Sequence, residues 1–347
     1  MASTEDAYAD YTRAVAQCRT KVFGSREGLT ALDLADGERY VAALIEGSLR
    51  FVHCDAGHPV FAPWTTAERR WVDNGRDAAY WIAALDGRHR YRVHGRRGTD
   101  CYLSFTVYAG SPGHPESVAL NVNHVDLGAG QGDPYSIDIE PPADACYVIA
   151  RQYYLDPDND RPATMEIDVI DGPATVLTDD ARAAAWRAAT DFLEAMVAPR
   201  APGATPPRWV STTANVMGDP AAWSASDGGG RGTPDQVYAM GPYALDADEA
   251  LVVEVAFPAC AYAGAALWNR FSQSIDARFH RSTINHRQAV AGANGVARIV
   301  IAHRDPGVAN WLDTGGRTRG TVYWRFLLAD QAPPPLKCTV LPIHELR

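Results

Sequence analysis

The densest group of polar side chains lies in the run Arg278–Arg287, with the sequence RFHRSTINHR. It holds three arginines, two histidines and an asparagine, which is more than a turn requires. Because imidazole titrates near neutral pH, His280 or His286 could move a proton, and we expect them to be catalytic. The alternative is an exposed basic loop. The spacing of the two histidines fits neither one helix face nor a zinc motif, so no metal site is expected.

Two further arginines, Arg151 and Arg325, fall on strand faces that are otherwise apolar. Their same-face neighbours, two residues apart, are Tyr147, Ile149 and Tyr153 for the first and Tyr323 and Leu327 for the second. A buried guanidinium needs a partner, and structural salt bridges with acidic residues of other strands would supply one: Glu166, Asp168 or Glu254. The functional interpretation is that both arginines hold an anionic or carbonyl group in a pocket.

Aromatic residues that stand beside polar ones suit a pocket for an apolar ligand with one polar end. The chain has nine tryptophans and fifteen tyrosines, and a structural core explains them equally well. The candidate substrate-binding residues are Trp81, Tyr153, Trp268, Asn269, Asn310 and Trp311, with the two asparagines orienting the bound group.

Composition excludes several classes of function. A net charge of −10 opposes nucleic-acid binding, and the only lysines, Lys21 and Lys337, leave few candidates for lysine chemistry. The motifs of nucleotide-binding loops, nucleophile elbows and zinc peptidases are missing from the sequence, so we expect no cofactor. Six scattered cysteines indicate reduced thiols. With no signal peptide or membrane span expected, the predicted location is cytoplasmic.

The elements that must position these residues are mainly β. Residues 1–73 read as a helical segment, with helices at 4–24, after Asp36 and at 65–68. Residues 74–177 form a first β domain, 178–207 a connecting helix and proline-rich linker, and 208–347 a second β domain. The predicted strands of the first domain are 80–84, 88–94, 101–108, 118–125, 135–139, 146–154 and 165–170, the first three as a meander. Those of the second are 250–257, 296–303, 321–328 and 336–341. The expected fold is a pair of β-sandwich or jelly-roll-like halves.

One long motif resembles a known family. The run Asp305–Gly316, DPGVANWLDTGG, together with Gly95–Thr99, Arg151-Gln152-Tyr153 and Leu267-Trp268-Asn269, is similar to bacterial proteins of domain of unknown function 1214 (DUF1214). The resemblance covers about Arg69 to the C-terminus. It implies a mainly β, jelly-roll-like fold, and it implies no established activity.

We therefore expect a cofactor-independent acid/base enzyme of secondary metabolism that acts on a small hydrophobic metabolite, such as a terpenoid, steroid, polyketide or lipid. The reaction would be a cyclisation, isomerisation, elimination or hydrolysis, of the lyase, isomerase or hydrolase type. His280 or His286 would move the proton while Arg151 and Arg325 hold the anionic or carbonyl group. One alternative is a non-catalytic lipid- or glycan-binding β protein. Another is an assembly component whose β faces form a homo-oligomer.

Overall fold

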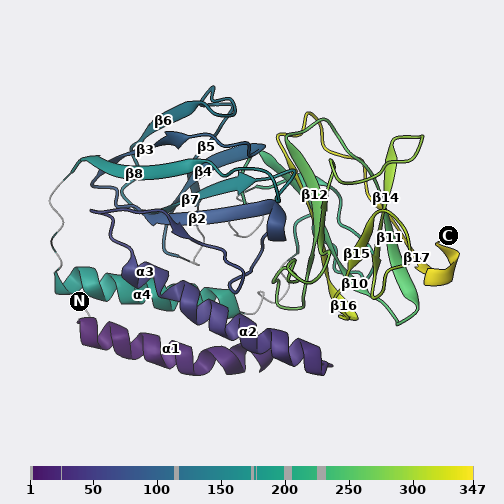
Figure 1. Ribbon diagram of the computed structural model, residues 1–347. Helices are drawn as coiled ribbons and strands as arrows, with labels where there is room; N and C mark the ends of the chain where they lie inside the picture. The colour runs from purple at the N-terminus through teal and green to yellow at the C-terminus, as the bar shows by residue number, and fades with distance from the viewer. Residues whose placement is uncertain are drawn as a thin grey trace.

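A computed structural model of the chain describes residues 3–24, 26–112, 117–172, 176, 178–198, 205–224 and 232–346. Its elements form a left half and a right half, with helices along one side of the left half (Figure 1). The predicted fold class, mainly β with two β halves, an N-terminal helical segment and a connecting helix, is confirmed.

The first half is a two-layer β-sandwich. One sheet has the strand order β1-β2-β7-β4-β5 and the other the order β6-β3-β8. The strands are β1 (Ala62–Pro63), β2 (Ala78–Ala84), β3 (Arg90–Arg96), β4 (Tyr102–Ala109), β5 (Ser117–Asn123), β6 (Pro134–Ile139), β7 (Ala145–Tyr153) and β8 (Thr164–Asp171). Between the sheets lies a core that includes Tyr91, Phe105 and Val148. Because side chains alternate along a strand, the opposite face of β7 is left to pack elsewhere.

Helices cover that opposite face. They are α1 (Thr4–Gly24), α2 (Ala31–Ser48), α3 (Arg50–His53) and α4 (Asp179–Val197), and Figure 1 shows them beneath β2 and β7. The largest hydrophobic cluster lies between them and the sheet and includes Leu44, Tyr147 and Phe192. At the start of α2, Thr30 and Asp33 form a capping box, in which each side chain accepts a hydrogen bond from the other residue's backbone N–H.

The second half is another two-layer sandwich. Its sheets have the orders β13-β12-β16-β10-β9 and β15-β14-β11-β17, and their inner faces enclose a core that includes Val253, Ile299 and Trp324. The strands are β9 (Ala221–Ala222), β10 (Gln236–Ala244), β11 (Glu249–Ala256), β12 (Tyr262–Trp268), β13 (Thr283–Asn285), β14 (Val296–Ala302), β15 (Trp311–Asp313), β16 (Arg319–Leu327) and β17 (Lys337–Pro342). The described residues also form two 3-10 turns, Gly75–Asp77 and Ile343–Glu345.

The two halves are joined by buried polar contacts as well as by aromatic side chains. Asp77, just before β2, accepts hydrogen bonds from Tyr262 Oη (2.8 Å) and Asn285 Nδ2 (3.2 Å) of the second half. Across the same boundary, Tyr102 Oη donates to Asp235 Oδ2 at 2.7 Å. The outer face of β10, β12 and β16 thus lies against the first half.

Most of the predicted helices and strands are present, whereas the predicted pairing of strands is wrong. The predicted helix at 4–24, the connecting helix (α4) and all eleven predicted strands are present within a few residues. The second helix begins at Ala31 rather than after Asp36, since its cap is Thr30, and 65–68 forms no helix. The predicted meander is wrong: β3 lies in a different sheet from β2 and β4. The predicted linker stays untested, since residues 199–204 lie outside the described ranges.

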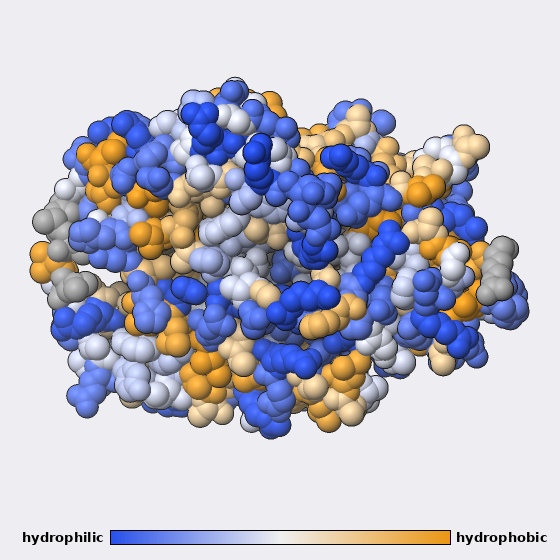
Figure 2. Space-filling view, viewed as in Figure 1, coloured by the Kyte–Doolittle hydropathy of each residue, from blue (hydrophilic) through white to orange (hydrophobic). Residues whose placement is uncertain are grey.

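On the face seen in Figure 2, hydrophobic residues form small groups among hydrophilic ones rather than one broad surface. None of the helices in the described ranges is long and apolar enough to cross a membrane.

Candidate functional site

Arg151 and Arg325 come from different halves of the molecule and meet at one cavity between them. Alternation along β7 places Arg151 on the helix-facing side of its sheet, with Ile149. Alternation along β16 places Arg325 and Tyr323 on the outer side of theirs, while Trp324 and Phe326 enter the core. Both arginines are buried. Both arginines line this one cavity, and their predicted role there stays a prediction.

Arg151 is held by hydroxyl groups of its own sheet. Its Nη1 donates to Thr106 Oγ1 and its Nη2 to Tyr108 Oη, each at 2.7 Å. Tyr80 lies directly opposite Arg151 in the β2–β7 register, with its ring centroid 5.9 Å from the guanidinium carbon. The guanidinium is thus fixed in place beside Tyr80.

Arg325 is held by tyrosines of both halves. Its Nη1 donates to Tyr80 Oη, and its Nη2 donates to Tyr323 Oη at 3.2 Å and to the Val72 carbonyl at 3.5 Å. The guanidinium carbon lies 5.0 Å from the ring centroid of Tyr323 and 5.5 Å from that of Tyr238, its cross-strand neighbour. These are distances at which a cation interacts with an aromatic face.

No carboxylate in the described part of the chain pairs with Arg325. The negative charge of Asp73 favours the charged form of Arg325, but the two side chains form no ion pair. Asp73 Oδ1 instead accepts a hydrogen bond from the Gly75 N–H at 3.1 Å. Burial lowers the pKa of Arg325, and the charge of Arg151 lowers it further. Arginine nevertheless stays protonated in proteins, so Arg325 is a buried cation without an ion-pair partner.

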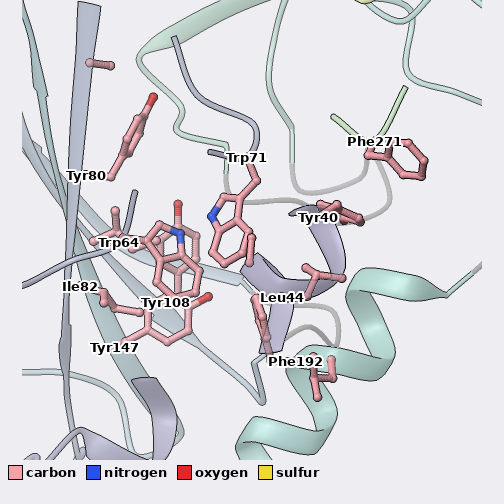
Figure 3. Close-up of a cluster of buried hydrophobic side chains, with 14 of the residues drawn as sticks. Tyr40, Leu44, Trp64, Trp71, Tyr80, Ile82, Tyr108, Tyr147, Phe192 and Phe271 are labelled. Atoms are coloured by element: carbon pink, nitrogen blue, oxygen red, sulfur yellow. The ribbon is translucent and has the colours of Figure 1, made fainter. Parts of the chain in front are cut away.

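The cavity has a volume of about 250 Å³ and a mostly apolar wall. Its aromatic lining is Trp64, Trp71, Trp209, Trp223, Tyr80, Tyr238 and Tyr323. Figure 3 shows Trp64 and Trp71 side by side between Tyr80 on the sheet and Phe192 on α4. Their ring centroids are 5.2 Å apart.

Three buried N–H groups around this cavity have no acceptor among the described residues. They are Arg325 Nε, Trp71 Nε1 and Gln236 Nε2. All three belong to residues that line the cavity. A buried donor without an acceptor costs about 1–3 kcal/mol, so an acceptor oxygen within reach of any of these three groups would stabilise the protein.

Tyr80 links the two arginines. Its hydroxyl accepts from Arg325 and shares a 2.6 Å hydrogen bond with Tyr153 Oη. Burial raises the pKa of Tyr80, and the two guanidinium groups only partly oppose this. The phenol therefore stays protonated and can serve as a hydrogen-bond donor or a proton donor.

Backbone strain accompanies the site. Val72, on the cavity wall, has φ of +50°, a conformation that is rare for a β-branched residue. Its N–H donates to the Ser272 carbonyl at 2.9 Å, and its own carbonyl faces Arg325. Strained backbone of this kind is common at ligand sites.

The two predicted histidines lie elsewhere, which corrects the expected convergence. His280 Nδ1 is 2.7 Å from Asp313 Oδ2 in a separate polar surface pocket. His286 Nδ1 accepts from the Ala263 N–H at 3.0 Å, and burial lowers its pKa. The histidines were predicted because many polar residues lie near them in the sequence. Both belong to connecting segments, and neither lines the apolar cavity.

Two predicted binding residues contact side chains that line the cavity. Trp268 stacks on Tyr323, with ring centroids 4.1 Å apart, and its Nε1 donates to the Asp73 carbonyl at 2.8 Å. Tyr153 bonds the Tyr80 hydroxyl. Both residues therefore position a wall residue rather than line the cavity themselves.

The other four predicted binding residues do not line the cavity. Trp81 packs against the core between the sheets of the first half. Asn269 bonds Gln273 and nearby backbone amides, and Asn310 bonds Val290 and the Arg298 carbonyl. Trp311 Nε1 donates to the Ala302 carbonyl at 3.1 Å. Their polar groups are engaged in loop and strand structure.

The acidic residues named as salt-bridge partners for the two arginines are also elsewhere. Asp168 contacts His94 at 2.8 Å, Glu166 lies opposite His94 in the β3–β8 register, and Glu254 lies opposite Arg298. Sequence reasoning missed Tyr80 and Tyr238. Tyr80 could have been found from the alternation Ala78, Tyr80, Ile82, whereas Tyr238 lies on a strand that was not predicted.

Within the described ranges, no group of three or more His, Cys, Asp or Glu side chains is arranged to hold a metal ion. The polar groups of the cavity are mainly N–H and O–H donors, which suit an anion.

Comparison with known proteins supports the fold. Neither a family model nor a curated protein matches the chain, so the resemblance to the DUF1214 proteins stays a prediction. The chain is similar to the crystal structure of an uncharacterised protein from Burkholderia cenocepacia, with 27% identity, a TM-score of 0.84 and 98% of each chain covered. A protein from Vibrio parahaemolyticus has 13% identity and a TM-score of 0.47, over 94% of this chain and all of the other. The arrangement of helices and two β halves is thus shared, over its whole length, with the Burkholderia protein.

Proposed function

We propose that this chain binds a small, mostly apolar molecule that carries an anionic group, in the cavity between its two halves. The observation that carries this proposal is Arg325, a buried guanidinium without a carboxylate partner at an aromatic cavity. This is close to the binding alternative expected from the sequence, with a small amphipathic anion in place of a lipid or glycan.

The energetics favour an anionic ligand. Burying a charge without a partner is costly, and an anion beside Arg325 would offset that cost. The remaining lone pairs of the anion could accept hydrogen bonds from the buried N–H groups of Trp71 and Gln236. The aromatic wall would meanwhile contact the apolar part of the ligand.

Isothermal titration calorimetry of the full chain tests this with three anions, hexanoate, benzoate and phenyl phosphate, and with hexanamide, benzamide and phenol as neutral partners. We expect at least one anion to bind once per chain. Its neutral partner should bind at least about tenfold more weakly, since a hydrogen bond to a charged group contributes about 1.5–3 kcal/mol.

The variant Arg325→Met should lose this binding, whereas Arg319→Met, which removes an exposed arginine of the same strand, should keep it. If no anion of the panel binds, or if Arg325→Met binds as tightly as the original chain, the proposal is wrong.

A second candidate function is the acid/base enzyme expected from the sequence, acting in the same cavity. Tyr80, rather than a histidine, would then donate the proton, because its hydroxyl lies between Arg325 and Tyr153. Arg325 would stabilise the phenolate that forms. The test is to incubate a bound anion with the chain and follow it by mass spectrometry: conversion that Tyr80→Phe abolishes supports the enzyme, and unchanged ligand excludes it for that compound.

A further inference from the structure

We infer that the ligand of this cavity is a monocarboxylic acid with a single aromatic ring. This inference rests on the proposed function and narrows it, because size, wall chemistry and charge count each restrict the class of anion.

The volume of the cavity favours a ligand with one ring. An apolar cavity of about 150 Å³ is large enough to hold benzene. The cavity here, at about 250 Å³, has room for one ring with a carboxyl group and a short spacer. Four fused rings, as in a steroid, would extend beyond this space.

The wall favours an aromatic ring over an aliphatic chain. On the side of the second half, Trp209, Tyr238 and Tyr323 form a row with centroid separations of 5.4 and 5.8 Å. On the side of the first half, Trp64 and Trp71 face the same space. Aromatic pairs at such separations gain energy beyond that of the buried area alone.

The charge count favours a carboxylate over a phosphate. Arg325 is a buried cation with no carboxylate partner among the described residues, and one negative charge is enough to balance it. A phosphate monoester would bring nearly two charges into the same apolar space.

The test measures affinities of the full chain for five acids by calorimetry and by quenching of tryptophan fluorescence. They are benzoate, phenylacetate, cyclohexanecarboxylate, hexanoate and pyrene-1-carboxylate, with phenyl phosphate as the alternative anion. We expect benzoate or phenylacetate to bind once per chain, roughly 3- to 10-fold more tightly than cyclohexanecarboxylate, which has the same ring size without the aromatic face. Phenyl phosphate should bind more weakly, and pyrene-1-carboxylate should not compete.

A variant separates ring recognition from charge recognition. Trp209→Leu should remove the advantage of benzoate over cyclohexanecarboxylate and leave the affinity for cyclohexanecarboxylate unchanged, while Trp209→Phe should keep the advantage.

The outcomes distinguish this inference from the proposed function. Equal affinity for hexanoate, cyclohexanecarboxylate and benzoate, tighter binding of phenyl phosphate, or competition by pyrene-1-carboxylate would overturn the aromatic-acid class and leave anion binding intact. Absence of binding by every anion would overturn both.

Discussion

Replacing Arg325 by methionine tests whether this arginine binds a ligand or stabilises the fold. Methionine keeps much of the length of the side chain but removes the charge. If Arg325 serves a ligand, the empty protein should tolerate the change, because no carboxylate is left behind. Arg97 provides the contrast, since it is a buried arginine that is paired within the first half.

The two variants differ in what they leave unpaired. Arg97 Nε lies 3.0 Å from Asp100 Oδ2, and its other nitrogens donate to the carbonyls of Ala129 and Asp100 at 2.9 and 2.7 Å. Arg97→Met leaves Asp100 buried and uncompensated, at a cost of about 3–5 kcal/mol.

Arg325→Met loses its hydrogen bonds to Tyr80 and Tyr323, which contribute about 1.5–3 kcal/mol each. It also removes the desolvation cost of a buried cation, which is several kcal/mol. The two effects oppose each other, so the free energy of unfolding should fall by clearly less than it does in Arg97→Met.

Urea denaturation of both variants without ligand, followed by circular dichroism, measures these differences. A loss of stability in Arg325→Met as large as that in Arg97→Met would show that Arg325 is structural and would refute the reasoning. A small loss together with abolished binding of the anions would support it.

Three other changes test the remaining geometry. Burial raises the pKa of Asp77 from 3.8 to about 6; the folded state then binds this proton more tightly than the unfolded state does, so stability falls as pH rises from about 4 to 6. This difference in pKa corresponds to a loss of about 3 kcal/mol, measured as the free energy of unfolding against pH, and Asp77→Asn should remove it. His280→Asn and His286→Asn should leave anion affinity unchanged in calorimetry, since neither residue lines the cavity. Gly47→Ala should lower stability by about 1–3 kcal/mol and weaken anion binding, because the new Cβ would lie 2.1 Å from the Trp71 ring.

The changes at Asp77 and Gly47 each have a control in the same chain. Asp171→Asn removes an exposed carboxylate of β8 and should keep the pH dependence. Gly24→Ala, at the end of α1, meets no neighbouring atom within 4 Å and should not affect binding. A flat pH profile for the original chain, a large loss of affinity in either histidine variant, or unchanged binding in Gly47→Ala would contradict the respective prediction.

The sequence by itself determined the local features of this protein. The alternation of Arg151 with Ile149 and of Arg325 with Tyr323 is a property of the strand alone, because successive side chains point to opposite faces. The helix at 179–197 was readable in the same way, since its apolar stripe repeats at helical spacing. Both arginines could therefore be assigned to apolar faces before any fold was known.

Only the tertiary structure decided which faces meet. The partners of a strand are set by contacts between residues far apart in the chain, so β3 could leave the expected meander for another sheet, and Tyr238 could reach Arg325 from a strand that local pattern did not reveal. The same long-range packing places Arg325 beside Tyr80, 245 residues away in sequence, and keeps His280 with Asp313 outside the cavity. Alternation along a strand determines which face of the sheet a side chain occupies. The residues that it then contacts are determined by the packing of one half against the other.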